Sequence, residues 1–246
     1  MRVTNEPVRC AVKIEHSEND AKHLAGISLF DSIGVQRRKE GENEWHDIYK
    51  ANYYGNSSLN FITYDYTVSS HQTYEYRNVF YLKRQARNAT LETVGEVVSV
   101  YAYFDGFLIA DKNNIYVSLA DPKYTYQKDF NVAFVKPYNS KYPHAIRNGE
   151  ASSYSGTFEG IFNPLDENCQ FAKRYADFED EIVDFLSRPT SKIFKTFDGH
   201  VWYIHVNTPV KKLDDQIGGF VKLQFSWNEI GALPDNINEL IAEAIG

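Results

Sequence analysis

Seven histidines are the residues of this chain best suited to bind a metal ion or to transfer protons. None belongs to a His-Glu-x-x-His or His-x-His arrangement, and His200 and His205, five residues apart, fall on opposite faces of the strand predicted around them. The two cysteines, Cys10 and Cys169, have no Cys-x-x-Cys or Cys/His spacing near them. The sequence therefore predicts no metal site and no disulfide framework, and both thiols are predicted to be buried.

No group of residues has the pattern of an active site. Ser155-Gly156 lacks the flanking glycines of a nucleophile elbow, and its strand context indicates a small-residue site where two backbones approach closely. Gly218-Gly219 is not followed by the lysine of a phosphate-binding loop. The acidic run 177–181 is interpreted as the solvated face of a helix. We therefore predict a protein that is not an enzyme, with no catalytic residue and no cofactor.

Aromatic side chains offer another kind of chemistry, because their rings can stack against sugars. Strand alternation predicts that about half of them lie in the core, and Tyr and Trp are also enriched at subunit contacts. Burial in the core or at subunit contacts is therefore the first interpretation of these aromatic residues. Binding of a host-surface glycan through Trp45 or Tyr54 is the second. The full set of candidates is Trp45, Tyr53, Tyr54, Trp202, Tyr203 and Trp227.

Charge and hydropathy narrow the range of partners. The 246 residues carry a net charge of -7 and have a pI near 5.5, which argues against nucleic acid and an anionic membrane as partners. No apolar run approaches the length of a membrane span, and the first 20 residues contain no signal-peptide core. We expect a soluble protein that is made in the cytosol.

The first hundred residues, from about 8 to 103, read as short strands separated by polar breaks. Segments 34–39 and 45–49 flank a charged turn and predict a hairpin, in which the basic run 36–39 pairs with Glu40, Glu42 or Glu44. Two more strands are predicted at 61–68 and 73–82. Strands at such regular spacing, with no helical run between them, are typical of a β-sandwich.

These residues resemble a fibronectin type III domain. The run 73–77 (Thr-Tyr-Glu-Tyr-Arg) follows a polar turn and a strand that ends at Val68, and it is similar to the start of that domain's sixth strand. The run 35–38 (Val-Gln-Arg-Arg), with Trp45 further along, is similar to its third strand and following turn. The resemblance implies that Tyr74 is the corner tyrosine, whose hydroxyl bonds upstream backbone while its ring packs between the sheets.

The second half combines strands with one helix. A turn is predicted at Asn148-Gly149, a dipeptide suited to type I′ geometry. Apolar residues at steps of three and four, with acids opposite them, predict a helix at about 170–186 that ends before Pro189. Strands are predicted at 131–136, 143–147, 153–162 and 221–227.

A hairpin and a long polar loop are predicted between the helix and the closing strand. Asp198-Gly199 separates two alternating segments, 192–197 and 200–206, and is the clearest hairpin pattern in the sequence. The loop 207–220, together with a sheet edge, is predicted to supply assembly contacts, because connecting segments often carry function. Residues 234–245 predict a short terminal helix.

In their order, the segments within residues 105–231 resemble a minor structural protein of a long-tailed bacteriophage. The resemblance rests on Tyr142-Pro143 with the following Asn-Gly, on the run 154–160 (Tyr-Ser-Gly-Thr-Phe-Glu-Gly), and on the hairpin pattern from Lys192 to Trp202. It implies a β-sandwich with one helix, akin to tail-tube and distal-tail domains, which assemble into rings at the tail tip. In distal tail proteins the ring domain comes first, whereas here it follows the fibronectin-like segment.

Together these patterns predict a mainly β protein of two β-sandwich domains. Residues 1–104 form a fibronectin type III-like domain, and residues 105–246 form a tail-tube-like domain with one packed helix. The predicted function is that of a non-enzymatic structural protein of a phage tail, in the distal tail or baseplate of the virion, made in the host cytoplasm. The predicted partners are other tail proteins and further copies of the chain, in a ring of three or six. The alternative is a carbohydrate-binding adhesin or receptor-binding module of the tail tip.

Overall fold

The computed structural model describes residues 1–21, 30–82, 91–111, 113–162, 175–213 and 221–233. These residues form antiparallel strands and one α-helix, so the prediction of a mainly β fold of the sandwich type is confirmed. They divide into two compact units, which are described separately. Unit 1 comprises the described residues of 1–117 together with 195–201, and unit 2 comprises those of 118–194 and 202–233.

The two units do not coincide with the predicted domains 1–104 and 105–246. Unit 1 includes strand β9 (Phe107–Ala110) and also the short segment 195–201 from later in the sequence. Phe107 and Phe197, far apart in the sequence, pack edge to face with ring centroids 5.6 Å apart. A contact of this kind is invisible to a reading of composition along the chain, and the domain limits at 104/105 stay a prediction.

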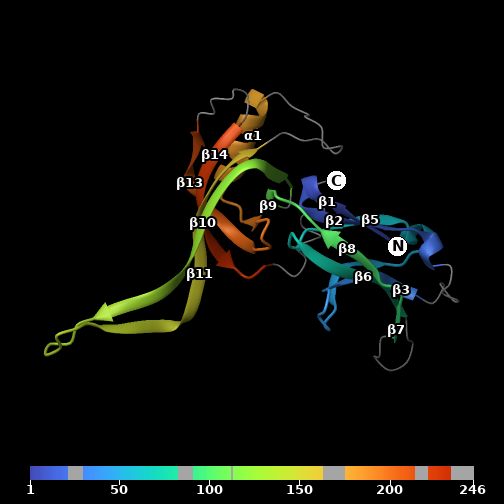
Figure 1. Cartoon of the computed structure of the whole chain (residues 1–246), viewed down its shortest axis with the longest axis horizontal. Coiled ribbons are helices and arrows are strands. Elements are labelled where there is room, and N and C mark those ends of the chain that lie inside the picture. Colours follow the sequence, from blue (N-terminus) through green and yellow to red (C-terminus); the bar gives the residue numbers. More distant parts are fainter. Residues whose placement is uncertain (22–29, 83–90, 112, 163–174, 214–220, 234–246) are drawn as a thin grey trace. The chain divides into compact units, whose positions relative to one another are not determined.

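Two antiparallel sheets build unit 1 (Figure 1). The first has the strand order β1-β2-β5, and the second has the order β4-β3-β6-β7, with β8 also paired to β6. The strands are β1 (Arg2–Glu6), β2 (Ala11–His16), β3 (Phe30–Lys39), β4 (His46–Asn52), β5 (Phe61–Asp65), β6 (Gln72–Leu82), β7 (Leu91–Val94) and β8 (Val98–Ala102), and short 3-10 helices span Pro7–Arg9, Glu18–Ala21 and Asn56–Leu59.

The period-two pattern of the sequence decides which side chains of unit 1 face the core. Along β6, buried Tyr74, Tyr76 and Asn78 alternate with half-buried Glu75 and Arg77. The predicted hairpin around residues 40–44 is confirmed, because β3 and β4 pair from Ser32 opposite Asn52 to Arg37 opposite His46. A cluster of fully or nearly fully buried apolar residues fills part of the interior: Phe30, Ile33, Leu59 and Phe80.

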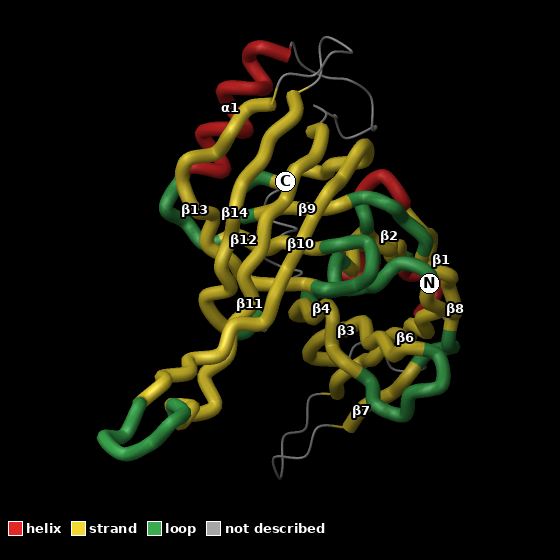
Figure 2. The backbone as a smooth tube through the Cα atoms, turned by 60° about the vertical axis from the view of Figure 1, so that its left-hand side comes forward, coloured by secondary structure: helices red, strands yellow, loops and turns green. Residues whose placement is uncertain are grey.

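Unit 2 holds one helix and most strands of a closed barrel. Within this barrel, β10, β11, β14, β13 and β12 are successive neighbours (Figure 2). The elements are β10 (Ile115–Val135), β11 (His144–Phe162), α1 (Tyr175–Ser187), β12 (Lys192–Lys195), β13 (Val201–Leu213) and β14 (Val221–Gly231). Its buried core is largely aromatic and includes Phe158, Phe194, Phe225, Trp202 and Trp227.

Helix α1 matches the predicted amphipathic helix where it is described. It spans Tyr175–Ser187 and ends two residues before Pro189, while residues 170–174 lie outside the described residues. Its apolar stripe is buried, and each large side chain placed there contributes roughly 1.5–3 kcal/mol to packing the helix against the unit. The stripe consists of Phe178, Ile182, Phe185 and Leu186.

The predicted hairpin at Asp198-Gly199 is confirmed. The amide of Gly199 donates to the carbonyl of Thr196 at 3.1 Å, and the amide of Thr196 donates to the carbonyl of His200 at 2.9 Å. Gly199 has φ of 93°, a left-handed conformation that side chains with a Cβ rarely adopt. Glycine is therefore required at this turn by its backbone geometry.

The turn predicted at Asn148-Gly149 is wrong. Strands β10 and β11 form one long hairpin whose chain reversal lies further along, at residues 136–143. The pairing passes from Phe130 opposite Ser152 to Val132 opposite Arg147, so residues 148–151 oppose a single residue of β10. Strand pairing continues on both sides of Asn148-Gly149, and the turn-forming dipeptide is accommodated as extra residues within β11.

The assembly loop predicted at 207–220 is wrong in its first half. Residues 207–213 belong to β13, and Lys211 pairs with Gln224 of β14. Their polar sequence reflects an exposed stretch of barrel strand, where both faces can carry polar side chains. Residues 214–220, the terminal helix predicted at 234–245 and Cys169 lie outside the described residues.

Candidate assembly interface

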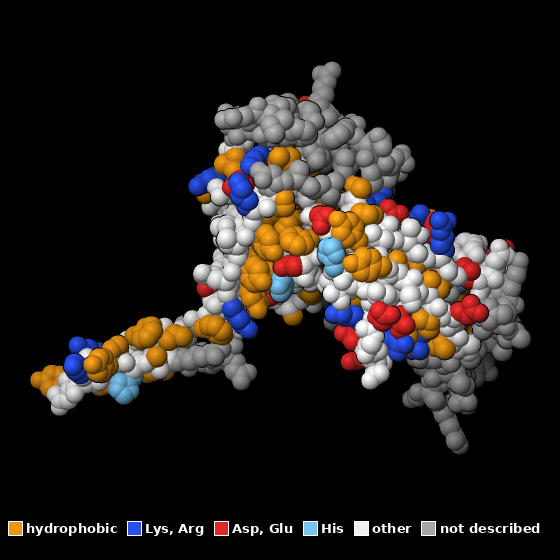
Figure 3. All heavy atoms as spheres, viewed as in Figure 1, with side chains coloured by type: hydrophobic (Ala, Val, Ile, Leu, Met, Phe, Trp, Pro, Cys, Tyr) orange, Lys and Arg blue, Asp and Glu red, His pale blue; other side chains and the backbone are white. Residues whose placement is uncertain are grey.

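The most distinctive surface of unit 2 is the outer part of the β10–β11 hairpin. We call residues 131–147 the distal arm: it contains the end of β10, the chain reversal and the start of β11. Apolar side chains run along it, with basic side chains near its tip (Figure 3). Phe134 is 72% exposed, Tyr142 is 67% exposed and Tyr138 is fully exposed. Contiguous apolar surface of this kind marks a contact site more often than a free surface.

Both faces of the distal arm are apolar. Residues directly opposite each other in an antiparallel pair share a face, and here Phe134 pairs with Ala145 while Ala133 pairs with Ile146. Phe134 and Val132 therefore lie on one face, and Val135 and Ile146 lie on the other. Val135 is 47% exposed and Ile146 is 51% exposed. The distal arm therefore exposes apolar side chains on both of its faces.

The root of the arm is anchored in the aromatic core of the barrel. Tyr126 and Tyr154 pack against Trp202, with ring centroids 5.2 and 5.9 Å from it. The amide of Tyr154 donates to Oε2 of Glu229 at 2.8 Å, and Ser155 Oγ donates to a carboxylate oxygen of Asp129. These contacts hold the root in place, so the orientation of the arm's first part is set by the barrel.

Gly156 stands where the root of the arm meets the core. A Cβ built at this residue would lie 2.2 Å from the carbonyl oxygen of Thr125 and 2.9 Å from the ring of Trp227. The expectation that Ser155-Gly156 marks a close approach of two backbones is therefore confirmed. No reactive role is needed to explain this pair of residues.

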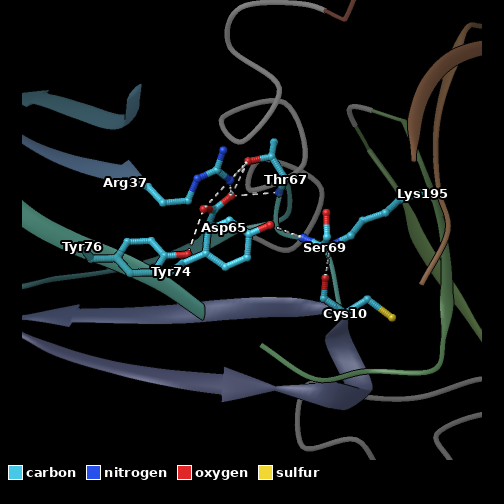
Figure 4. Close-up of polar contacts among 8 residues, drawn as sticks. All are labelled: Cys10, Arg37, Asp65, Thr67, Ser69, Tyr74, Tyr76 and Lys195. Carbon is cyan, nitrogen blue, oxygen red and sulfur yellow. Dashed lines mark hydrogen bonds and ion pairs between the residues drawn. The ribbon is translucent and has the colours of Figure 1, made fainter. Parts of the chain in front are cut away.

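A polar cluster joins the two sheets of unit 1 (Figure 4). Asp65, at the end of β5, is fully buried and accepts hydrogen bonds from Arg37 Nη1 at 3.0 Å and from the hydroxyl of Tyr76 at 3.0 Å. The amide and hydroxyl of Thr67 donate to its other carboxylate oxygen at 2.8 and 2.6 Å. Arg37 and Tyr76 lie on β3 and β6, so a single carboxylate connects three strands of both sheets.

The partner of Asp65 keeps it ionised. Burial alone would raise the pKa of this carboxyl, but the charge of Arg37 and the hydrogen bonds from Thr67 outweigh burial and hold the pKa below its ordinary value. The expected pairing of the basic run 36–39 with Glu40, Glu42 or Glu44 is wrong for its two arginines. Arg37 faces inward to Asp65, and Arg38 pairs across the sheet with Glu75 at 2.5 Å.

Tyr74 has the burial and the backbone hydrogen bond that the fibronectin resemblance implies for a corner tyrosine. Its ring is 5% exposed, and its hydroxyl accepts a hydrogen bond from the amide of Ser69, five residues upstream, at 2.8 Å (Figure 4). The predicted hydrogen bond to upstream backbone is therefore present. The guanidinium of Arg37 lies over the same ring, 5.1 Å from its centroid.

Replacing Tyr74 by Phe is expected to destabilise unit 1 by about 1–3 kcal/mol, because the amide of Ser69 loses its acceptor while the ring remains in place. Chemical denaturation of the purified variant measures the change. Tyr138→Phe is the matched control, since the Tyr138 side chain is fully exposed, and it is expected to change stability by less than about 0.5 kcal/mol. Equal effects of the two variants would contradict the corner role.

Lys195 is a buried cation in unit 1. Its side chain is 1% exposed, its ammonium donates to the carbonyl oxygen of Cys10, and it lies 4.3 Å from the ring centroid of Phe104. Burial lowers the pKa of this ammonium to about 8, and burial raises the pKa of the neighbouring Cys10 thiol to about 11. The ammonium thus fastens segment 195–201 to the start of β2.

The lowered pKa of Lys195 predicts a rise of stability with pH. Above pH 8 the folded chain loses this proton while the unfolded chain, with a lysine pKa near 10.4, keeps it, so the unfolded state binds more protons and the free energy of unfolding increases. Lys195→Met removes this titration. From pH 8 to pH 9 the unfolding free energy of the wild type is expected to gain about 1 kcal/mol relative to Lys195→Met in denaturant titrations. A constant difference between the two proteins would refute the assignment.

The aromatic candidates for glycan binding do not come together at one site. Trp202 and Trp227 are buried in the core of unit 2, with ring centroids 4.9 Å apart, and Tyr203 is half-buried. Trp45 in unit 1 is contacted by two guanidinium groups, those of Arg38 and Arg77, whose carbons lie 4.6 and 4.2 Å from its centroid.

Tyr53 and Tyr54 differ in exposure. Tyr53 packs edge to face against Phe30 and donates from its hydroxyl to Asn56 at 2.9 Å. Tyr54 is 84% exposed, and its hydroxyl accepts from the amide group of Asn52 at 3.2 Å. Of the six candidates, Tyr54 is the one that offers a mostly exposed ring.

Among the described residues, no group of three or more His, Cys, Asp or Glu side chains is arranged to hold a metal ion. No helix in the described part of the chain is long and apolar enough to cross a membrane.

Sequence reasoning identified the strands of the distal arm but missed that both of its faces are apolar and exposed. A signal was present in residues 131–135 (Asn-Val-Ala-Phe-Val), where consecutive apolar residues point to both faces of a strand. This pattern is typical of a strand covered on both faces. In the described part of the chain, β11 pairs with this segment, but large fractions of the segment's apolar side chains stay exposed.

Comparisons with known proteins find little. No family model and no curated protein matches the sequence. Among solved structures, a chain of the virion of a native gene transfer agent particle aligns with 52% of this chain and 92% of its own length, at 13% identity and a TM-score of 0.31. A chain from the tail of an empty gene transfer agent particle with C6 symmetry aligns with 48% of this chain and 81% of its own length, at 11% identity and a TM-score of 0.29. At these TM-scores the alignments establish neither a shared fold nor a shared function.

Proposed function

We propose that this chain is a non-enzymatic structural subunit of a phage or phage-like tail, located in the distal tail or baseplate of the virion and made in the host cytoplasm. The observation that carries the proposal is the distal arm. A lone two-stranded hairpin is at best marginally stable in water, and this one exposes apolar side chains on both faces. A segment of this kind is suited to a subunit whose surface is completed by assembly.

The sequence resemblance indicates the kind of assembly. The residues that resemble minor tail proteins lie within 105–231. Unit 2 shares antiparallel strands and one packed helix with the β-sandwich that the resemblance implies, although its strands belong to a closed barrel. In unit 1, the two-sheet strand order and the hydrogen bond between Tyr74 and Ser69 support a fibronectin type III-like domain. Such a domain would serve as a spacer or an adhesive addition to the assembling unit.

The mechanism is geometric. When a patch on one subunit contacts a different patch on the next, repetition of the contact closes into a ring if the rotation allows it. A ring of three or six copies, in contact with other tail proteins, is the proposed form. The distal arm takes the contact role that the sequence suggested for loop 207–220, because residues 207–213 are engaged in barrel pairing.

A receptor-binding or carbohydrate-binding module of the tail tip is the second candidate. The observation that favours it is the exposed ring of Tyr54 beside Asn52 and Ser58, which supply polar groups next to an aromatic surface. In this alternative the fibronectin-like unit displays the binding face. The contacts of Trp45 with two arginines argue against Trp45 as the stacking platform.

Light scattering of the purified full chain across a concentration series tests the proposal. A closed oligomer of three or six copies is the expected result. A monomer at all concentrations that binds host-surface glycans on an array, and loses that binding in Tyr54→Ala, would instead establish the second candidate.

A further inference from the structure

We propose that the distal arm of one copy inserts into the body of a second copy and is covered there on both faces. This inference rests on the proposed function, since it specifies how the subunits of the assembly contact each other. The contact is heterologous: the arm meets a surface outside the arm.

The pairing register shows that docking of the arm on one face alone would leave apolar side chains exposed on the other face. Val132 and Phe134 lie on one face of the hairpin and Val135 and Ile146 on the other, and each of the four is between 38% and 72% exposed. If one face lay on a flat surface, the opposite face would still present two large apolar side chains to water. Insertion between two surfaces removes both faces from water and also supports a hairpin that is marginal by itself.

Charge indicates a second copy of this chain as the occupant. The distal arm, residues 131–147, contains three Lys or Arg and no Asp or Glu, which gives a charge of +3. The whole chain carries -7, so the remaining residues carry -10. A basic arm on an otherwise acidic chain is electrostatically complementary to the body of its own copies and repelled by their arms. This charge distribution favours arm-to-body contacts over arm-to-arm contacts.

Acidic surface is available on the body of unit 2. Asp177, Asp180 and Asp184 follow one another at steps of three and four along α1, and all three are exposed. Because these side chains are exposed, their negative charge lies at the surface of unit 2 and not in its interior. The arm's own lysines, Lys136 and Lys141, lie within its chain reversal, where they would contact acidic groups of the second copy.

Single substitutions on each face test two-sided burial. Phe134→Ser and Ile146→Ser, measured by sedimentation velocity of the full chain, are each expected to raise the dissociation constant of the assembly at least about tenfold. Tyr54→Ser is the control, because it removes an exposed aromatic ring of unit 1 outside the arm. If only one of the two arm variants weakens assembly, two-sided insertion is overturned.

Salt and lysine variants test the charge argument. Assembly of the wild type is expected to weaken severalfold between 50 and 500 mM NaCl, because screening acts on charge complementarity and not on apolar burial. The pair Lys136→Gln and Lys141→Gln is expected to weaken assembly and to reduce its salt dependence. The control pair Lys50→Gln and Lys211→Gln removes equal charge from exposed positions outside the arm. Equal effects of both pairs would contradict a specific role of the arm's charge.

A trimmed chain distinguishes arm-to-body from arm-to-arm contact. Phe130 and Ser152 are directly opposite, so residues 131–151 can be replaced by Asn-Gly, a two-residue turn that fits this geometry. The trimmed chain offers a body but no arm. Mixed with wild type at low ratio, it is expected to accept an arm and stop further growth, which lowers the mass of the assemblies.

The outcomes of mixing separate this inference from the proposed function. If the trimmed chain stays outside assemblies and leaves the wild type unaffected, arms contact arms and the inference is overturned. If the trimmed chain assembles as well as the wild type, the arm is not the contact, although ring formation stands. If the wild type stays monomeric to about 1 mM, contact between copies is overturned, and location of the chain in tails is decided separately by labelling of particles.

Discussion

Replacing Asp65 by Ala is expected to destabilise unit 1 by about 3–5 kcal/mol, because it leaves the guanidinium of Arg37 largely buried without its counter-charge. The variant also removes the acceptor for Tyr76 and for both donors of Thr67. Since whole domains are stable by only about 5–15 kcal/mol, a loss of this size brings unit 1 close to unfolding under ordinary conditions. Hydrogen exchange of peptides from β3, β5 and β6, followed by mass spectrometry, measures the change within the unit.

Two controls separate the buried pair from ordinary surface charge. Lys212→Ala breaks an ion pair with Glu179 in which the lysine is 55% exposed, and it is expected to cost less than about 1 kcal/mol. The pH dependence provides the second control. The pKa of Asp65 is held below its ordinary value, so its contribution is fully present above about pH 4 and is lost as the pH falls through the lowered folded value. The gap between wild type and Asp65→Ala should therefore narrow only in acid, and a gap unchanged at low pH would contradict the ion-pair account.

Replacing Gly156 by Ala is expected to destabilise unit 2 by about 3 kcal/mol, at the upper end of overpacking effects. The added methyl would meet the carbonyl oxygen of Thr125 at 2.2 Å, and a backbone oxygen in a paired strand cannot move away as a flexible side chain can. The ring of Trp227 closes the other side at 2.9 Å. Trp202 and Trp227 are both buried in unit 2, so in a Trp45→Phe background tryptophan fluorescence in a denaturant titration reports on this unit.

Gly231→Ala is the matched control for Gly156. Gly231 lies on β14 of the same barrel, and a Cβ built there has no atom within 4 Å. This variant is expected to change stability by less than about 0.5 kcal/mol. If the two alanine variants lose equal stability, the close approach of β10 and β11 at the root of the arm is not what requires glycine at 156.

Much of unit 1 could be predicted from local patterns. Period-two alternation located β3, β4, β5 and β6 in the sequence, and alternating burial is clearest along β5 and the middle of β6. The same alternation requires Arg37 and Arg38 to face opposite ways, so one of them must be buried. From the sequence, both arginines were predicted to pair with glutamates of the neighbouring turn. The buried acceptor of Arg37, Asp65, belongs to the other sheet, and only the tertiary fold brings the two together.

Unit 2 was harder to predict because its key features depend on register. Asn148-Gly149 has the chemistry of a hairpin turn, yet β11 continues to pair with β10 on either side of it. The chain reverses at residues 136–143, before β11 begins. The return of residues 195–201 to unit 1 likewise depends on long-range contacts, of Lys195 with Cys10 and of Phe197 with Phe107. The helix and the Asp198-Gly199 hairpin were predictable because their signals are local.

The location of this chain in assembled particles tests the central claim most directly. The measurement is immunogold electron microscopy of particles purified from cells that make the chain with a small epitope tag. The account predicts gold at the tip of the tail, in particles that remain intact. Labelled protein that never copurifies with particles, although the tagged chain is folded and abundant, would contradict a structural role in the tail.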